Sequence, residues 1–511
     1  MMFYATIGRM VLIAAIMLAP AAVWAADGEL RLQAIDSKTG QPIPVRVELP
    51  NSRGRPMRLK KVGTAELGDH FYLSGTATLG LRRGDYVFKM DAGPEYRTQN
   101  GSFTIDRYAD DDKSVEMRRF ADLAAEGWFA GDLDSQRSSR DLPIVAATEG
   151  ISYAPSTAWT FDGKKWTKSH FLVLESVDDQ VPLAAGRTLG PYTTRVELAG
   201  GTLLLVSDEL LEEPPLELAA GVTSLEVIHQ AREAGLHVVA ATPTAWEYPL
   251  WVASGELDGV CLLTSQSEWK RIVDKDPQGR PRDKSFYPGK SGLVLWGEDI
   301  YFHTINCGVE LSPLAGSGSG ANESPLGINC TYAHLPNAFT PAAWWDAVDH
   351  GAVVVTNGPL LRPSVSGEPP GTKFRLDDGQ TLDFQIALNM ASRQRVEYLE
   401  ILKNGQVDVE VRLSDWVSKG GKLPPVSFDS SGWFAVRAKT NTVDKREFAL
   451  TAPYYVESTA GPRISRKSVE FFLSWLDELE SRSDDSRSCT TDEVATAREL
   501  FRGLSAKSKA E

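Results

Sequence analysis

Apolar and polar residues alternate along the first predicted unit of the chain, residues 26–119. The segments 45–49, 86–90 and 102–105 show strand-like patterns, and turn-forming residues lie between them. A period of two is typical of strands with one buried face, and no helix-period run of useful length interrupts the pattern. Residues 26–119 are therefore predicted to form a β-sandwich.

Strand-like and helix-like patterns alternate between residues 120 and 360. In chain order we expect strand 203–206, helix 224–234, strand 236–241, strand 259–263, helix 340–351 and strand 352–356. Such alternation predicts βα units arranged around a parallel sheet or barrel.

Residues 361–460 return to strand-like patterns. Apolar and polar residues alternate over 382–388, a further strand run covers 432–438, and Lys403-Asn404-Gly405-Gln406 is a hairpin signal. We predict a second β-sandwich here.

The last segment, residues 461–511, has helical spacing. Its apolar residues recur at intervals of three and four, and Thr490 and Glu493 form a capping-box pattern before the second run. This pattern predicts two amphipathic helices that dock on the body of the protein. A helix that binds a partner protein is the alternative.

Residues 1–25 have the pattern of a secretory signal peptide. Arg9 precedes an apolar core at 10–18 that is too short to span a bilayer, and Ala25 ends the segment at the expected cleavage position. An uncleaved anchor is the alternative. No later run is long and apolar enough to cross a membrane, so we expect the mature chain to be exported, to the periplasm or the extracellular space.

Length, charge and cysteine content narrow the function further. The chain has 511 residues, which predicts several domains, and a formal net charge of -14 without a long basic run. Nucleic acids and anionic membrane surfaces are therefore not expected as partners. The four cysteines allow three full disulfide pairings, but Cys261 lies in the apolar run 260–263, which favours a buried free thiol.

The stretch 127–137 carries the most informative polar residues. Apolar residues up to Phe129 give way to a polar loop with Asp132, Asp134, Gln136 and Arg137. Ligand sites of parallel α/β folds collect where strands end in such loops. We therefore expect these four side chains at the carboxyl end of the first barrel strand, inside a pocket.

This stretch resembles the opening motif of the PHP (polymerase and histidinol phosphatase) superfamily, in the secreted branch of CehA/McbA-type metallohydrolases. That motif reads Gly-Asp-Leu-His-x-His-Arg, and the chain matches it at 131–133 and at Arg137. Asp134 and Gln136 stand where the motif has its two histidines. Segments similar to other family motifs follow in the family's order, at 246–253, 301–308, 315–335 and 356–361. The resemblance implies a distorted (β/α)7-type barrel, flanked here by the two predicted sandwiches.

The resemblance also implies that the family's metal site is degenerate. Gln266 stands in place of a further expected histidine, and the run Gly316–Gly320 replaces a Ser-Asp-x-His segment. None of the seven histidines forms a His-x-His pair. His170 and His237 have positions from which they could point into the barrel, but a lone histidine is more often structural. The candidate pocket comprises Asp132, Asp134, Gln136, Arg137, Glu149, Gln266, Ser317, Ser319 and Asn329.

Three functions remain open at the level of the sequence. The first is a secreted pseudoenzyme that has lost metal-dependent hydrolysis, holds no cofactor, and binds an unidentified ligand or protein. The second is a divergent hydrolase of esters or phosphoesters, in which Asp132 and Asp134 hold a divalent metal such as magnesium or calcium through oxygen ligands. The third is a structural extracellular module. We expect no stoichiometric zinc, iron or manganese, because these metals favour imidazole ligands.

Overall fold

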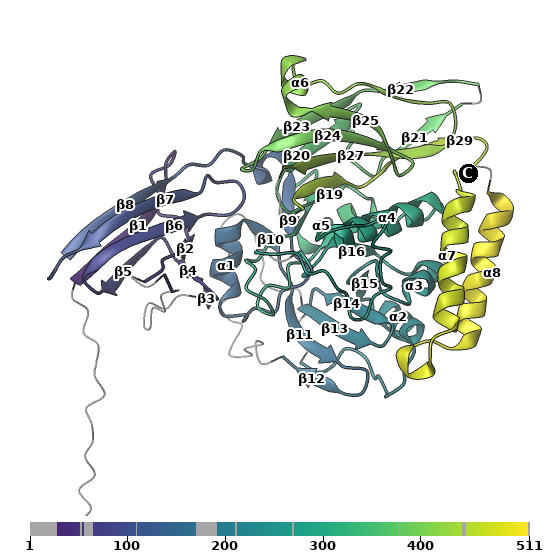
Figure 1. Cartoon of the computed structure of the whole chain (residues 1–511), viewed down its shortest axis with the longest axis horizontal. Coiled ribbons are helices and arrows are strands. Elements are labelled where there is room, and N and C mark those ends of the chain that lie inside the picture. Colours follow the sequence, from purple (N-terminus) through teal and green to yellow (C-terminus); the bar gives the residue numbers. More distant parts are fainter. Residues whose placement is uncertain are drawn as a thin grey trace, which may run out of the picture.

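The computed structural model describes residues 28–51, 54–55, 65–108, 110–169, 192–209, 212–267, 270–377, 379–441 and 446–508. Over these ranges the chain is a mixed α/β protein with several β-sheets and eight α-helices (Figure 1). The predicted signal peptide at 1–25 and His170 lie outside the described residues.

The N-terminal part forms two sheets, seen on the left of Figure 1. One has the order β5-β1-β8 and the other the order β3-β4-β2-β6-β7. Their strands are β1 (Gly28–Asp36), β2 (Val45–Glu48), β3 (Glu66–Leu67), β4 (His70–Leu73), β5 (Thr76–Leu81), β6 (Gly84–Asp91), β7 (Gln99–Ile105) and β8 (Asp110–Met117). Leu32 of β1, Val47 of β2 and Phe88 of β6 belong to one core cluster. The three strands predicted in this part are confirmed as β2, β6 and β7.

A seven-stranded sheet occupies the middle of the chain, with the order β12-β11-β13-β14-β15-β16-β17. Its strands are β11 (Ser156–Phe161), β12 (Trp166–Lys168), β13 (Tyr192–Leu198), β14 (Gly201–Ser207), β15 (His237–Ala240), β16 (Gly259–Leu263) and β17 (Ser312–Ala315). The expected parallel arrangement is only partly right. β15, β16 and β17 are parallel, but β14 is antiparallel to both of its neighbours. Only residues 199 and 200 join β13 to β14, and so short a connection permits only an antiparallel hairpin.

Helices follow the sequence pattern closely. α2 (Ser224–Glu233) begins after Thr223, whose hydroxyl accepts a hydrogen bond from the Glu226 N–H. α5 (Pro341–Asp349) begins in the same way after Thr340. The other helices of the central part are α1 (Leu142–Glu149), α3 (Tyr248–Ser254) and α4 (Gly292–Asn306). Both predicted helices, at 224–234 and 340–351, are confirmed.

A ten-stranded sheet joins the central part to the C-terminal part. Its main path is β10-β9-β18-β19-β28-β27-β24-β25, and β29 and β21 attach through β27. The strands are β9 (Trp128–Gly131), β10 (Ile151–Tyr153), β18 (Cys330–His334), β19 (Val353–Thr356), β21 (Lys373–Leu376), β24 (Val396–Lys403), β25 (Gln406–Arg412), β27 (Gly432–Thr440), β28 (Phe448–Thr451) and β29 (Tyr454–Ser458). Because β19 pairs with β28, one sheet crosses the boundary predicted at residue 360.

Strand predictions for residues 361–460 are partly confirmed. The 403–406 hairpin joins β24 and β25, and both Asn404 and Gly405 have the positive φ that this tight turn requires. The alternating run 382–388 is not one strand, however. It splits into β22 (Leu382–Phe384), which pairs with β26 (Val426–Phe428), and β23 (Ile386–Ala391), which pairs with β20 (Leu360–Val365). α6 (Leu413–Ser418) follows β25.

Apolar residues from the two large sheets meet in one core cluster. Val239 of β15, Leu314 of β17 and Val353 of β19 belong to it, together with Trp344 and Trp345 of α5. Cys261 of β16 is buried in the same cluster, and its thiol is free as predicted. The other three cysteines are free as well.

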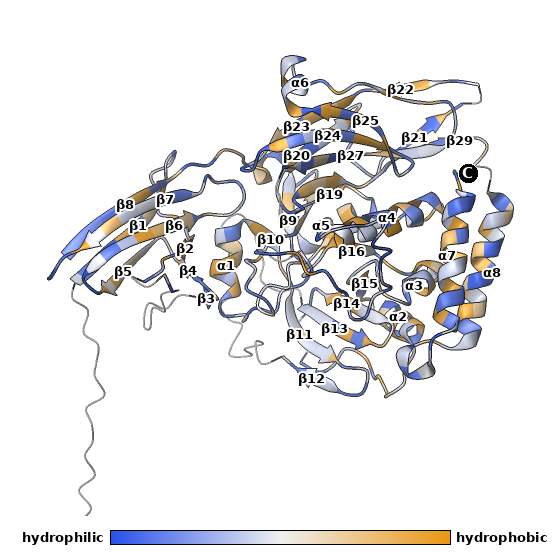
Figure 2. Ribbon diagram, in the orientation of Figure 1, coloured by the Kyte–Doolittle hydropathy of each residue, from blue (hydrophilic) through white to orange (hydrophobic). Residues whose placement is uncertain are grey.

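The two tail helices dock on the central part as predicted. α7 (Arg466–Glu480) buries Val469, Phe472, Leu476 and Leu479, and α8 (Thr491–Lys507) begins with the predicted capping box. Figure 2 shows apolar and hydrophilic residues alternating around both helices. Among the described residues, no helix is long and apolar enough to span a membrane.

Candidate functional site

Three parallel strands end at the same edge of the seven-stranded sheet. The residues that follow them are Ala241-Thr242 after β15, Thr264-Ser265-Gln266 after β16, and Gly316 after β17, and all of these line one cavity of about 350 Å³. The carboxyl ends of parallel strands are where ligand sites form in α/β folds. We call this space the strand-end cavity.

The polar loop 132–137 lies against this edge. β9 ends at Gly131, where a Cβ atom would come within 2.4 Å of the Trp344 ring, so only glycine fits. Beyond it, the Leu133 N–H donates to Ala315 O, and the Gln136 N–H donates to Ser319 O. These backbone bonds hold the loop beside the end of β17.

Asp132 is fully buried and its carboxylate is used within the protein. Oδ1 accepts the N–H groups of Ser317 at 2.9 Å and Asp134 at 3.2 Å, and Oδ2 accepts the N–H of Gly327 at 2.8 Å. Burial raises the pKa of Asp132 to about 7, although the hydrogen bonds from Ser317 and Gly327 act in the opposite direction. Asp132 therefore anchors the glycine- and serine-rich loop instead of facing the cavity.

Asp134 lines the strand-end cavity and forms an ion pair with Arg195 of β13. Its Oδ1 accepts from Arg195 Nη1 at 2.7 Å, and Arg195 Nε donates to Glu197 Oε1 at 3.2 Å. Both side chains of the Asp134–Arg195 pair are largely buried. Burying a charged side chain costs desolvation energy, and the attraction between the two opposite charges offsets this cost when they are hydrogen-bonded to each other.

Arg137 lies in the same loop but contacts the N-terminal part. Its Nε donates to the Ser319 hydroxyl at 3.0 Å, and its guanidinium carbon lies 5.3 Å from the centre of the Tyr72 ring. Arg137 is buried, whereas Gln136 is half-buried and bonds to Ser319 through its backbone. Arg137 therefore braces the loop that carries Asp132 and Asp134.

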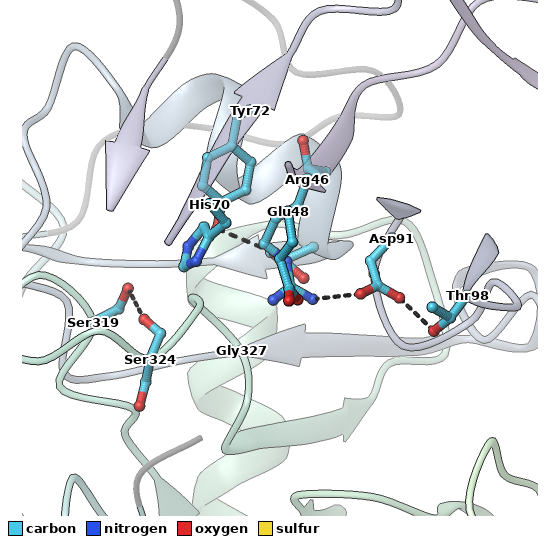
Figure 3. Close-up of polar contacts among 12 residues, drawn as sticks. Arg46, Glu48, His70, Tyr72, Asp91, Thr98, Ser319, Ser324 and Gly327 are labelled. Atoms are coloured by element: carbon cyan, nitrogen blue, oxygen red, sulfur yellow. Dashed lines mark hydrogen bonds and ion pairs between the residues drawn. The ribbon is translucent and has the colours of Figure 1, made fainter. Parts of the chain in front are cut away.

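Glu149, at the end of α1, belongs to a buried polar network between the N-terminal sheets and the central part. Its Oε1 forms an ion pair with Arg46, 2.9 Å from Nε, and accepts a hydrogen bond from the Tyr72 hydroxyl at 3.1 Å. Figure 3 shows Arg46 facing Asp91, which in turn accepts from Thr98. Burial raises the pKa of Glu149, and Arg46 opposes this rise. Glu149 thus lies in the contact between the two parts, away from the strand-end cavity.

Of the remaining predicted site residues, Ser317, Ser319 and Asn329 bond to loop backbones, and Gln266 lines the cavity. The Asn329 amide donates to Thr264 O at 2.8 Å, and the Ser317 hydroxyl donates to Asn329 O at 3.2 Å. Ser319 donates to Ser324 O at 2.8 Å, as Figure 3 also shows. These three side chains are buried and brace the loops between β16, β17 and β18.

Sequence reasoning missed several cavity residues. Arg195, Thr202, Lys275, Asp276 and Gln278 line the cavity with Asp134. Arg195 lies in the middle of a strand, and the other four lie at a strand start or in a long loop, so no motif marked them. The contact of Arg195 with Asp134 depends on strand register, which a single sequence does not define.

Within the described ranges, no group of three or more His, Cys, Asp or Glu side chains is placed to hold a metal ion. The described histidines lie in other environments. His237 stacks on Trp345 with ring centres 3.8 Å apart, and His303 stacks on Phe471 at 4.1 Å. Both therefore serve as packing residues at positions outside the strand-end cavity lining.

Comparisons with protein-family models, with curated proteins and with solved structures find no match. The resemblance to the PHP superfamily therefore rests on the sequence motifs alone.

Proposed function

We propose that this chain is an exported, PHP-like protein that binds a small molecule in the strand-end cavity and has lost metal-dependent hydrolysis. The observation that carries the proposal is how the motif carboxylates are used. Asp132 accepts three backbone N–H groups, and Asp134 is paired with Arg195, while a polar cavity opens beside them.

The donor set at this position does not fit a divalent metal. Coordination needs several convergent oxygen or nitrogen atoms with free lone pairs. Both Asp132 oxygens face backbone N–H groups, and Arg195 places a positive charge 2.7 Å from Asp134 Oδ1. A cation beside that guanidinium would be repelled. A metal-dependent reaction step does not fit this donor set.

The cavity itself supports binding. Its volume of about 350 Å³ lies within the range of roughly 300–1,000 Å³ that is usual for small-molecule sites. Its lining mixes charged, amide and hydroxyl groups with apolar residues such as Leu204 and Val273. Such a lining orients a small polar ligand through a limited number of hydrogen bonds.

The proposal includes an assignment of the sheets to a PHP-like barrel and two β-sandwiches. The seven-stranded sheet, together with β9, β10, β18 and β19, would correspond to the distorted PHP-like barrel, because both sheets contribute to one shared core. The paired N-terminal sheets around their own core would be the first sandwich. The strands after residue 360 would be the second.

Metal content and turnover test the proposal directly. We expect well under one equivalent of zinc, iron or manganese per chain after dialysis, and no turnover of generic ester or phosphoester substrates with added metals. Near-equimolar metal together with chelator-sensitive turnover would overturn the proposal in favour of the divergent hydrolase. Absence of ligand-induced stabilisation with every small molecule in a broad screen would favour the structural module instead.

A further inference from the structure

The Asp134–Arg195 pair offers two hydrogen-bonding atoms of opposite kind in the wall of the strand-end cavity. The bonds that the described residues make to this pair use Asp134 Oδ1, Arg195 Nη1 and Arg195 Nε. The second carboxylate oxygen and the second terminal guanidinium nitrogen have no hydrogen-bond partner among the described residues. The pair therefore keeps one acceptor oxygen and one donor nitrogen that these bonds do not use.

Three further polar side chains line this cavity without a hydrogen bond or ion pair to the described part of the chain. They are the Ser265 hydroxyl, the Gln266 amide and the Lys275 ammonium group. A hydroxyl and an amide each both donate and accept. The other polar groups are satisfied: Thr202 donates to Gln278, and Asp276 accepts from Thr244. The lining groups without a partner in the described chain are thus a mixed set of donors and acceptors.

The charges around the cavity do not favour an anion. Asp134 and Asp276 balance Arg195 and Lys275 among the lining residues. Glu197 also pairs with Arg195, and Asp132 lies directly behind Asp134. A phosphate or carboxylate ligand needs a surplus of positive charge, which this arrangement lacks.

No aromatic side chain among the described residues lines the cavity. Flat ligands such as nucleobases and aryl esters are commonly held by stacking on aromatic rings. The apolar part of the lining consists of small and aliphatic groups, including Leu204, Val273 and Pro277. These suit aliphatic C–H surfaces.

We propose that the strand-end cavity binds a neutral, hydroxyl-rich molecule of about monosaccharide size. This inference rests on the proposed binding function and names its ligand class. A hydroxyl group both donates and accepts, so one ligand hydroxyl donates to the free Asp134 oxygen while its neighbour accepts from Arg195. Gln266 and Ser265 then bond to hydroxyls on the other side of the ligand.

Isothermal titration calorimetry with the mature chain tests this inference. The probes are D-glucose, D-galactose, L-arabinose and mannitol at millimolar concentrations, with inorganic phosphate and adenosine as ligands of other classes. We expect saturable binding of at least one sugar or polyol, and none of phosphate or adenosine. Asp134→Asn should weaken that binding about tenfold or more, because it replaces a charged hydrogen-bond acceptor with a neutral one. Gln266→Ala should weaken it less.

Asp477→Asn is the matched control, because Asp477 forms an aspartate–arginine ion pair with Arg498 at an exposed position of α7. Its binding should equal that of the unmodified chain. Absence of saturable binding of every sugar and polyol, or binding unaffected by Asp134→Asn, would overturn the inference. Binding of phosphate or adenosine that Asp134→Asn abolishes would refute the ligand class but leave the binding function intact. Metal-dependent turnover, measured separately, is what refutes the function.

Discussion

The carboxylate of Asp132 is used entirely within the protein. It is enclosed between the loop after β9, Ser317 and Gly327. A buried carboxylate needs hydrogen-bond donors to offset the cost of its burial, and three backbone N–H groups donate to Asp132. The buried position leaves Asp132 sensitive to pH.

The stability contributed by Asp132 should fall as pH rises towards neutrality. Burial raises the pKa of Asp132 from 3.8 to about 7, so between these values the folded chain binds more protons than the unfolded chain. The contribution is therefore complete below pH 3.8 and is lost as the pH passes 7. Urea unfolding of the unmodified chain and of Asp132→Asn, each at pH 5 and pH 8, measures the effect. The unmodified chain should lose stability relative to the variant between these values, and a pH-independent difference would contradict this account.

Arg137 should be a structural brace that lysine cannot replace. Its guanidinium both donates to Ser319 and lies over the Tyr72 ring, and a lysine ammonium lacks the planar fork that makes both contacts at once. We expect Arg137→Lys to lower the free energy of unfolding by about 1–3 kcal/mol. Arg140→Lys, at an exposed position in the same region, is the control and should change little. Equal stabilities of the two variants would show that Arg137 does not brace the loop.

At the scale of helices and strands, the sequence predicted the features that depend on neighbouring residues, namely helix starts and a tight turn. Thr340 and the Thr490–Glu493 capping box marked helix starts, and Asn404-Gly405 marked a hairpin. The prediction of a single strand over 382–388 was wrong. The alternation of apolar and polar residues continues across residue 385, where the chain stops pairing with β26 and starts pairing with β20. Which strands pair with each other depends on residues far apart in the sequence, so a periodic pattern within one strand does not predict it.

The candidate site, too, was predicted only where it depends on neighbouring residues in the sequence. The motif led to the loop after β9 and to Asp134, which lines the cavity. It did not lead to Arg195, because the ion pair joins residues 61 positions apart through strand register. Nor did it separate Glu149 from the site, since sequence proximity to Asp132 gives no sign that the side chain points to Arg46.

The tail helices should contribute substantially to stability through Trp475 of α7. This side chain is fully buried, packs against Trp296 and Phe472, and donates to Trp246 O. Trp475→Ala should lower the free energy of unfolding by about 3–5 kcal/mol, the usual cost of removing a buried aromatic side chain. Leu500→Ala, on the exposed side of α8, should cost far less. Similar losses in denaturant unfolding would argue against tail docking as a stabilising contact.

At the scale of the whole molecule, polar and apolar contacts join parts that the sequence pattern separates. Arg393, in the C-terminal part, donates to Asp91 at 3.0 Å and to Tyr96 O at 2.6 Å in the N-terminal part. One core cluster contains Trp128 and Tyr332 from the central part together with Phe434 and Tyr454 from the C-terminal part. A change in residue pattern along the chain therefore marks a change of local structure and does not by itself mark an independent folding unit.

A fragment that ends at residue 360 should consequently fail to fold on its own. Cutting there removes β28, which pairs with β19 through Val354↔Thr451 and Thr356↔Ala449. β19 keeps its pairing with β18 but becomes an edge strand with three consecutive valines. The cut also uncovers Trp128 and Tyr332, whose cluster partners Phe434 and Tyr454 are lost. Exposed edges and apolar patches of this kind favour aggregation.

Expression of residues 26–360 beside residues 26–511 tests this expectation. The short fragment should be insoluble or lack near-ultraviolet circular dichroism and cooperative unfolding, whereas the longer chain should show both. A third fragment, 26–460, retains the complete ten-stranded sheet but lacks α7 and α8. It should fold with lower stability, because it loses the tail contacts but keeps every strand pair of that sheet. Cooperative unfolding of 26–360 with a native-like spectrum would show instead that the boundary at 360 separates two domains and that the β19–β28 pairing only joins them.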